Sequence, residues 1–273
     1  MSDLELQQYL FDLQGYLVIK NVLSKEEVAT LNELLDQQDI HMTGERKNFG
    51  RAPERGSGFL EWGKPFCDLL DHPTIMPILQ FRLGDCFRLD RLFGFQIREG
   101  TPGGDLHADY GASKTIGREE GLPENYLKSE AHPGEYFHIR DNEILNGFVV
   151  VSWNLTDTGP ETGGVCCIPG SHKSNFRLPQ KIFVAPEKAP CVVIPSVPAG
   201  SVIIFTEALT HGSTDWKGKY DRRTLLYKYC VSHMSWSGKL VEPPTNTELT
   251  PRQKILFAQP GAPYRHFPSL FED

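Results

Sequence analysis

The hydrophobic pattern of the first third of the chain is mainly helical. Ser24 and Glu27 have the residue types and spacing of a capping box, and apolar residues then recur on one helical face. This pattern predicts a helix over residues 25–37. A shorter helix is expected over 4–13, and another over 73–79 with proline in its first turn. Residues 15–19, between the first two helices, are typical of a strand.

The pattern changes from about residue 87 onward to short runs of β-branched and aromatic residues. Each run is bounded by Gly, Pro, Asn or Asp, which is the pattern of strands joined by turns. The predicted strands are 88–97, 147–155, 164–168, 191–194, 201–205 and 222–231. Many short strands behind a helical N-terminal third favour a mainly β fold with flanking helices, either a sandwich or a barrel, and a jelly roll is one such arrangement.

A long polar stretch, rich in Gly, Glu and Lys, interrupts the predicted strands at residues 110–142. A loop of that length in a compact domain is commonly a lid over a site, and disorder without ligand is the alternative interpretation. We therefore expect a single domain over 1–273. Residues 1–85 form its helical region, 86–235 its β core with the 110–142 insertion, and 236–273 a tail that packs on the core.

Charge and composition exclude several classes of function. The chain has 28 Lys and Arg residues against 35 Asp and Glu, and its formal net charge of −7 is the wrong sign for a nucleic-acid-binding protein. Its apolar runs are too short to cross a bilayer, and the N-terminus does not have the pattern of a signal peptide. The six cysteines form no C-x-x-C pair, so buried thiols in a reducing compartment are favoured over disulfides or zinc. We expect a cytoplasmic protein that binds neither nucleic acid nor membrane.

Only one of the nine histidines is followed two residues later by a carboxylate, in His107-Ala108-Asp109. About one such pair is expected by chance in a chain of this composition, so the motif alone is weak. In an extended segment, however, His107 and Asp109 project to the same face and could both bind one metal ion.

A mononuclear iron site of the two-histidine, one-carboxylate type needs one further histidine. His211 is the best candidate, because it follows a turn and a strongly apolar strand and precedes a polar loop. The alternative from position alone is a surface histidine in a loop.

Strand alternation in 222–231 separates two adjacent arginines. Arg222 and Thr224 project to one face and Arg223 to the other, so one arginine points inward. A buried guanidinium needs an anionic partner, and its fork suits a carboxylate held by two hydrogen bonds. That partner is either a ligand or a carboxylate of the protein itself, and Thr224 could add a hydroxyl to the same carboxylate.

Together these features resemble the phytanoyl-CoA dioxygenase family of iron(II)- and 2-oxoglutarate-dependent oxygenases, which includes ectoine hydroxylase. The resemblance rests on His107-x-Asp109, on His211, on Arg222 eleven residues later, and on the segment GGVCCIPGSHK at 163–173. That segment is similar to the family's N-G-x-L-x-x-I-P-G-S-H-K stretch and is the most specific of these signals. The resemblance implies a double-stranded β-helix core of the jelly-roll, cupin-like type.

The resemblance also implies roles for individual residues. His107, Asp109 and His211 would bind Fe(II), and Arg222 would bind the distal carboxylate of 2-oxoglutarate. Trp153 matches a family tryptophan beside this cosubstrate, with a core aromatic as the alternative. Gln96 could face cosubstrate or substrate, and His172 is interpreted as a structural residue of the Ser-His-Lys turn.

The implied reaction is hydroxylation of a small molecule with O2, with succinate and CO2 as coproducts. A carboxylate at Asp109 favours hydroxylation over halogenation, since halogenating relatives have Ala or Gly at that position. The chain departs from the family mainly between Asp109 and Asn146, and the scattered cations there provide only a modest track for the phosphates of a CoA thioester. Two alternatives remain open: a jelly-roll protein with zinc or another divalent ion that acts as a hydrolase or isomerase, and a non-enzymatic binding protein of the same fold.

Overall fold

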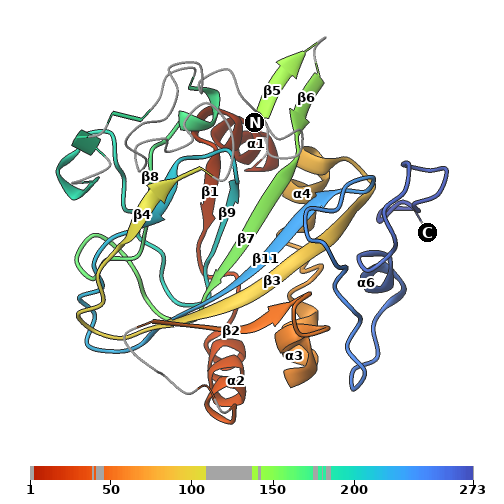
Figure 1. Ribbon diagram of the computed structural model, residues 1–273, viewed down its shortest axis with the longest axis horizontal. Coiled ribbons are helices and arrows are strands. Elements are labelled where there is room, and N and C mark those ends of the chain that lie inside the picture. The colour runs from red at the N-terminus through yellow and green to blue at the C-terminus, as the bar shows by residue number, and fades with distance from the viewer. Residues whose placement is uncertain are drawn as a thin grey trace.

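The computed structural model describes residues 3–38, 40, 46–108, 137–140, 143–174, 178–179, 181–182 and 186–272, and for 137–140 and 143–146 it describes the backbone alone. Two antiparallel sheets face one another, with helices on the outer side of the larger sheet (Figure 1). The larger sheet has the strand order β1-β9-β7-β11-β3-β2. Its strands are β1 (Tyr16–Ile19), β9 (Val202–Thr206), β7 (Phe148–Asn154), β11 (Arg222–Val231), β3 (Phe87–Ile97) and β2 (Arg46–Ala52).

The smaller sheet has three strands, in the order β4 (Gly104–His107), β10 (His211–Ser213) and β8 (Val165–Cys167). A separate hairpin consists of β5 (Phe137–Arg140) and β6 (Glu143–Asn146). Apart from β3 and β2, strands that are neighbours in the larger or the smaller sheet are not consecutive in the chain. Two opposed antiparallel sheets with such crossover connections form a jelly roll. The expected fold class, a mainly β jelly-roll core with flanking helices, is confirmed.

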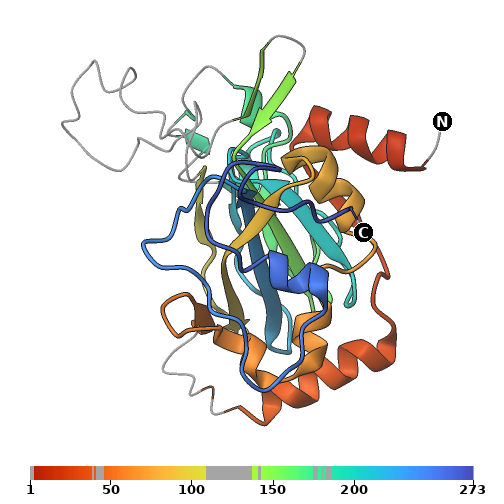
Figure 2. The same ribbon diagram turned by 90° about the vertical axis from the view of Figure 1, so that its right-hand side faces the viewer.

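The helices cover one face of the larger sheet (Figure 2). They are α1 (Asp3–Gln14), α2 (Lys25–Asp36), α3 (Lys64–Asp68), α4 (Met76–Leu83) and α6 (Pro251–Ile255), with the 3₁₀ turn η1 (Gly58–Trp62). Two further 3₁₀ turns, η3 (Ser171–Lys173) and η4 (Pro186–Lys188), follow β8 in the chain. The main core lies between these helices and the sheet, and it takes in alternate residues of β11, among them Tyr227 and Tyr229. Both tyrosine hydroxyls donate to main-chain carbonyls at 2.7 Å, to Phe66 of α3 and to Leu70 just after it. These bonds satisfy the phenol groups inside an otherwise apolar layer.

Strand alternation gives the opposite face of β11 a different environment. Arg222, Thr224, Leu226 and Lys228 all project toward the smaller sheet. A second, smaller hydrophobic cluster lies on this side and includes Leu226, Val150 and Phe205. The larger sheet therefore separates a packed helix-side core from a more polar interior.

Most of the predicted elements are present with small shifts. The helix expected over 25–37 is α2, and its capping box is formed by Ser24 and Glu27. The expectation for 73–79 was wrong in position, because α4 begins at Met76 and its N-terminal proline is Pro77. The expectation of a strand at 191–194 was also wrong, since Val193 makes only an isolated bridge to Cys167. None of the helices in the described ranges is both long and apolar enough to cross a membrane.

The segment that follows β11 returns to the helix side of the larger sheet. Gln253 of α6 donates to the carbonyl of Cys67 at 3.1 Å and to the Asp71 carboxylate at 2.8 Å. Leu256 and Leu270 are buried in the main core. The C-terminal segment is therefore part of the same packed layer as α3.

Candidate functional site

A cavity of about 710 Å³ lies between the two sheets. Its described wall includes the two predicted histidines, the predicted Arg222, two aromatic residues of β3, and residues of the paired strands β4 and β10. The lining residues are Arg46, Arg51, Arg91, Phe93, Phe95, Ile97, Gly104, Asp105, Leu106, His107, Ala108, Ser152, Val165, Phe205, His211, Gly212, Ser213, Arg222, Thr224, Leu226 and Lys228. Residues from 46 to 228 thus converge on one hollow, in the interior where jelly-roll proteins bind ligands.

The two histidines lie directly opposite one another on paired strands. In the antiparallel pairing of β4 with β10, His107 and His211 are register partners. Their ring centroids are 4.5 Å apart, and the ring planes are inclined by 51°. Two imidazoles so close together in a cavity wall can bind the same metal ion.

Each imidazole is oriented by the main-chain carbonyl of the residue two positions before it. Nδ1 of His107 lies 2.8 Å from the carbonyl of Asp105, and Nδ1 of His211 lies 2.8 Å from the carbonyl of Leu209. A carbonyl oxygen accepts hydrogen bonds and cannot donate, so Nδ1 carries the proton in both rings. The lone pair of each neutral ring is then on Nε2, which is the tautomer that metal-binding histidines adopt when a carbonyl holds the other nitrogen.

Close approach of the two strands fixes this register. A Cβ atom on Gly212 would lie 2.8 Å from the carbonyl oxygen of Asp105, and one on Gly103 would lie 2.3 Å from the carbonyl oxygen of Ser213. Neither position can accept a side chain without moving backbone atoms. Glycine at these two positions therefore allows β4 and β10 to bring their histidines together.

The segment 163–173, which carried the most specific sequence signal, supports His211 from the other side. Cys167 of β8 is the register partner of His211. The Thr210 main-chain N–H donates to the Ser171 hydroxyl at 2.8 Å, and the Ile168 N–H donates to the Thr210 carbonyl at 2.9 Å. These bonds hold the residue immediately before His211 on both of its peptide groups. The segment thus positions a histidine and contributes only Val165 to the cavity wall.

Arg222 brings a buried positive charge to the same cavity. Its side chain is 7% exposed, and it forms no ion pair with any carboxylate among the described residues. Its Nε has no hydrogen-bond partner there. Burial, with a further contribution from the charge of Arg46, lowers the pKa of Arg222 from 12.5 to about 10. The alternative of a salt bridge to a protein carboxylate is therefore not seen in the described structure.

Thr224 lies two residues further along the same face of β11. It is buried, and its hydroxyl has no hydrogen-bond partner among the described residues. Buried polar groups are nearly always hydrogen-bonded, so two adjacent unsatisfied donors indicate a site for an acceptor that comes from outside the protein. A carboxylate fits both donors.

The neighbouring Arg223 projects to the opposite face, as strand alternation predicts. Its guanidinium donates to the carboxylate of Asp36 at 2.5 Å and to the side-chain oxygen of Asn32 at 3.2 Å, both on α2. The charge of Arg223 is therefore satisfied on the helix side. Only Arg222 of this pair faces the cavity.

Two expectations need correction, and strand alternation explains both. Trp153 lies in the main core, with its ring 5.4 Å from that of His72, while its neighbour Ser152 lines the cavity. Trp153 is thus a core aromatic and does not lie beside a cosubstrate bound at Arg222. Gln96 also lies outside the cavity wall and donates to the carboxylate of Asp221 at 2.7 Å. The flanking Phe95 and Ile97 face inward in its place.

Asp109, the expected carboxylate ligand, lies outside the described residues, which resume at 137. Within the described ranges no three His, Cys, Asp or Glu side chains cluster as a metal site. The histidine pair is therefore the part of the expected triad that the structure describes, and the role of Asp109 stays a prediction. Ala108, which immediately precedes it, lines the cavity.

His172 is a buried residue of η3 that does not line the cavity. Its Nε2 lies 3.0 Å from the carbonyl of Asp12 in α1, and its ring covers Gly15. Burial lowers its pKa from 6.5 to about 4, so the ring is neutral at physiological pH. These contacts agree with its interpretation as a structural residue.

Sequence reasoning missed the cavity residues that come from β2 and β3. Arg46 lies on a strand whose sequence, RKNFGRA, is too polar and glycine-rich to predict a strand. Phe93 and Phe95 alternate with Leu92 and Gly94 on β3, and that alternation was the available signal for an inward aromatic face.

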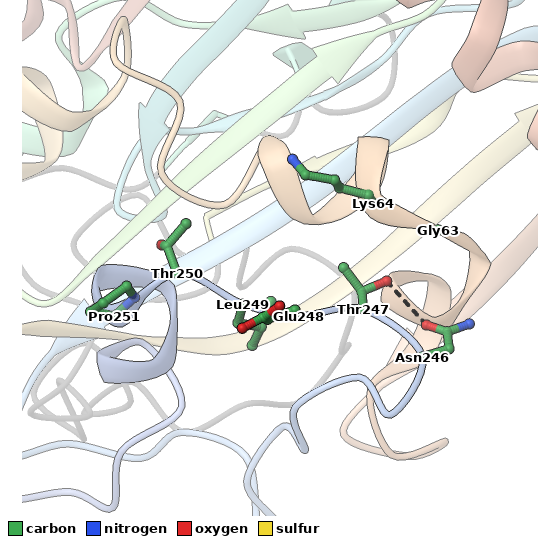
Figure 3. Close-up of a pocket in the computed structure, with 8 residues that line it drawn as sticks. All are labelled: Gly63, Lys64, Asn246, Thr247, Glu248, Leu249, Thr250 and Pro251. Atoms are coloured by element: carbon green, nitrogen blue, oxygen red, sulfur yellow. Dashed lines mark hydrogen bonds between the residues drawn. The ribbon is translucent and has the colours of Figure 1, made fainter.

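A second hollow lies on the helix side, between α3 and the residues that precede α6 (Figure 3). It has a volume of about 640 Å³ and is lined by Gly63, Lys64 and residues 246–251. The described lining contains no histidine or cysteine, and Lys64 is paired with Asp68 of its own helix. This hollow has none of the groups expected of a catalytic centre.

Comparison with known structures supports the assignment of the fold. HygX from Streptomyces hygroscopicus, solved with nickel, 2-oxoglutarate and hygromycin B, matches with a TM-score of 0.68 and 21% identity over 90% of this chain and 94% of HygX. HygX has also been solved with iron bound, with a TM-score of 0.65. The non-haem α-ketoglutarate-dependent epimerase SnoN of nogalamycin biosynthesis matches with a TM-score of 0.59 and 17% identity, over 99% of this chain and 96% of SnoN.

Comparison with sequences identifies the family. No curated protein sequence matches the chain at a significant level. The family model of phytanoyl-CoA dioxygenase matches residues 11–224, which include the strands β4, β10 and β8 and the segment from His107 to Arg222. The chain therefore belongs to the phytanoyl-CoA dioxygenase family.

Proposed function

We propose that this protein is an iron(II)- and 2-oxoglutarate-dependent dioxygenase that hydroxylates a small molecule. The observation that carries the proposal is a buried pair of donors, Arg222 and Thr224, in the same cavity as the facing histidines. Nε of Arg222 and the hydroxyl of Thr224 have no hydrogen-bond partner in the part of the chain that the structure describes. An enzyme that uses a metal alone has no need of this carboxylate site. An enzyme that binds a dicarboxylate beside its metal does.

The proposed metal ligands are Nε2 of His107, Nε2 of His211 and the carboxylate of Asp109. Support comes from the tautomers that the Asp105 and Leu209 carbonyls impose on the two rings. The position of Asp109, two residues after His107, adds the carboxylate of a two-histidine, one-carboxylate site, which leaves coordination positions open. HygX, which shares the fold, has been solved with iron and with nickel.

The proposed partner of Arg222 is the distal carboxylate of 2-oxoglutarate. A guanidinium can hold a carboxylate by two charge-assisted hydrogen bonds, and Thr224 can donate a third. Binding would supply the negative charge that the buried Arg222 otherwise lacks. HygX with 2-oxoglutarate bound is a precedent within the fold.

Bound iron and 2-oxoglutarate would together supply the oxidising chemistry, with consumption of O2 and release of succinate and CO2. The chain's own contribution is position and environment. His107 and His211 hold one face of the metal from paired strands, and Arg222 sets the orientation of the cosubstrate. Phe205, whose ring centroid lies 4.7 Å from that of His211, together with Phe93 shields this part of the cavity from water.

The choice of hydroxylation rests on Asp109, since a protein carboxylate on the metal occupies the position that a halide would need. Proteins of this fold carry out other oxidative reactions as well, including those of the carbocyclase SnoK and the epimerase SnoN. HygX has been solved with hygromycin B, so the fold accommodates a small-molecule ligand. All six cysteines are free thiols, which suits a reducing compartment such as the cytoplasm.

The proposal is tested by anaerobic addition of Fe(II) and 2-oxoglutarate to the metal-free protein. We expect a visible charge-transfer band, and after admission of O2 we expect slow succinate release that a substrate accelerates. A product heavier than the substrate by one oxygen atom would establish hydroxylation. Zn(II) in place of Fe(II) is the control and should give neither band nor succinate. Absence of both signals with Fe(II) would refute the proposal.

A further inference from the structure

A second arginine lies beside Arg222 in the cavity and is not used by the proposed chemistry. Arg46 of β2 and Arg222 of β11 are both register partners of Ile97, which lies on the strand between them. Two inter-strand spacings separate their Cα atoms by about 10 Å. Both arginines line the cavity.

Among the described residues, Arg46 contacts an aromatic ring but no carboxylate. Its guanidinium carbon lies 4.3 Å from the centre of the Phe95 ring. No hydrogen bond or ion pair joins Arg46 to any residue in the described part of the chain. Partial burial lowers its pKa, and its charge in turn lowers the pKa of Arg222. The two guanidinium groups are therefore close enough to interact electrostatically, and no carboxylate among the described residues pairs with either of them.

The other cations of the cavity wall are already paired. Arg51 forms an ion pair with Glu54 at 2.9 Å, and Arg91 with Asp90 at 3.2 Å. Lys228 is paired with the buried carboxylate of Glu207. Of the five cations in the described lining, only Arg46 and Arg222 have no carboxylate partner there.

The wall beside Arg46 is apolar and aromatic. Phe93 and Phe95 pack edge to face on β3, with ring centroids 5.1 Å apart. Asp105 is the one acidic residue in the described lining, and its carbonyl oxygen is used to orient His107. A cavity with an aromatic wall and an unpaired guanidinium at one end is complementary to a ligand that has an apolar body and one anionic group.

We propose that Arg46 forms an anion subsite for the substrate, which therefore carries a carboxylate or phosphate group on a largely apolar or aromatic body. This inference rests on the proposed function, because it assigns the two carboxylates of 2-oxoglutarate elsewhere, the distal one to Arg222 and the other to the metal. With these positions filled, Arg46 is the one cation of the described cavity wall that still has no carboxylate partner. A substrate anion held there would place the apolar body along Phe95 and Phe93, in the cavity that also contains the histidines.

The test uses probe ligands, because it does not require the natural substrate. The full-length protein is loaded with Mn(II), which replaces Fe(II) without turnover, and saturated with 2-oxoglutarate. Phenylacetate, phenyl phosphate and the neutral phenylacetamide are then titrated calorimetrically at low ionic strength. We expect at least one of the two anions to bind about tenfold more tightly than phenylacetamide, since a charge-assisted hydrogen bond is lost in the amide. The tighter anion identifies the group.

Two variants separate Arg46 from its neighbours. Arg46→Gln should reduce affinity for the preferred anion about tenfold, to the level of phenylacetamide, with 2-oxoglutarate affinity changed less than about twofold. Arg51→Gln is the matched control, from the same strand and the same wall, and should leave anion affinity nearly unchanged because its charge is already paired with Glu54. Arg222→Gln should show the opposite pattern and lose affinity for 2-oxoglutarate.

Two results would overturn the inference. One is wild-type protein that binds neither anion more tightly than phenylacetamide, a result that needs no variant. The other is an Arg46→Gln variant that loses 2-oxoglutarate affinity as strongly as Arg222→Gln, which would place Arg46 in the cosubstrate site. Failure of the wild-type protein to bind 2-oxoglutarate at all would instead contradict the proposed function, so the two failures are distinguishable.

Discussion

Replacement of Arg222 by methionine should make the ligand-free protein more stable while it weakens 2-oxoglutarate binding. In the folded protein the pKa of Arg222 is lowered by burial from 12.5 to about 10, so the charged guanidinium is less favourable inside the cavity than in the unfolded chain. Between those two pKa values the unfolded chain binds more protons than the folded chain, so folding stability depends on pH there. At neutral pH the guanidinium is charged in both states, and the full cost of burying its charge lowers the stability of the folded protein. Methionine fills most of the same space without a charge.

The size of this effect follows from the pKa shift. At about 1.4 kcal/mol for each pH unit, the shift corresponds to an upper limit of about 3.5 kcal/mol. Relaxation and water in the cavity will reduce it, so we expect the free energy of unfolding to rise by about 1–3 kcal/mol. The loss of charge-assisted hydrogen bonds to the cosubstrate should weaken 2-oxoglutarate binding by about 1.5–3 kcal/mol, which is a factor of ten to a hundred or more.

The assay combines urea unfolding of the ligand-free protein with thermal shifts in Mn(II) and increasing 2-oxoglutarate. Wild-type protein should unfold at lower urea than Arg222→Met. The variant should need about ten to a hundred times more 2-oxoglutarate than wild type for the same gain in thermal stability. Arg223→Met is the control, because it removes the pairing with Asp36 on the opposite face. It should lose up to about 1 kcal/mol of stability and keep the full response to 2-oxoglutarate. The reasoning would be refuted if the Arg222→Met variant were less stable than wild type and gained the same thermal stability at the same 2-oxoglutarate concentrations.

Three further predictions concern the metal site, the core and pH. Alanine at His107, His211 or Asp109 should each greatly reduce iron retention, measured as bound metal after gel filtration, and unchanged iron content would remove that residue from the site. Trp153→Phe should lower the free energy of unfolding by about 1–3 kcal/mol and leave 2-oxoglutarate affinity within about twofold, as binding isotherms can check. The pKa of His172 is lowered to about 4, so folding stability should fall as pH drops from 6.5 toward 4, where the unfolded chain binds the proton first. In His172→Gln that part of the pH dependence, up to about 3 kcal/mol, should be absent from urea midpoints, and an unchanged slope would contradict it.

The sequence predicted the elements whose residues have a clear periodicity. α2 shows its cap and its apolar face, and β7 and β11 are continuous apolar or alternating runs, so their existence and type follow from local pattern. β4 and β10 are only four and three residues long, and they contain Gly, Asp and His. They are strands because they pair with one another, and no local pattern reports a pairing across a hundred residues.

The candidate site was predictable to a similar extent. Alternation on β11 correctly separated Arg222 from Arg223, because a two-residue period is a local property. The same rule would have placed Trp153 with the core if the inward face of β7 had been known. A strand that is buried on both faces, and apolar throughout its first four residues, does not show clearly which face is which. Arg46 was missed because its role depends on β2 lying beside β3, which is a tertiary contact.

The pairing of His107 with His211 makes the metal site a property of strand register and not of chain proximity. A change in sequence length between Asp109 and β7 leaves the residues of β4 and β10 unchanged, together with β8 and Ser171, which support His211. Such a change therefore keeps the register that places the two imidazoles opposite one another. An insertion of a single residue inside β4 would instead turn His107 to the other face and remove it from His211. Sequence variation that is confined to the residues between Asp109 and β7 is therefore independent of the register that pairs the two histidines, and exchange of those residues is a route to new specificity that leaves the histidine pair in place.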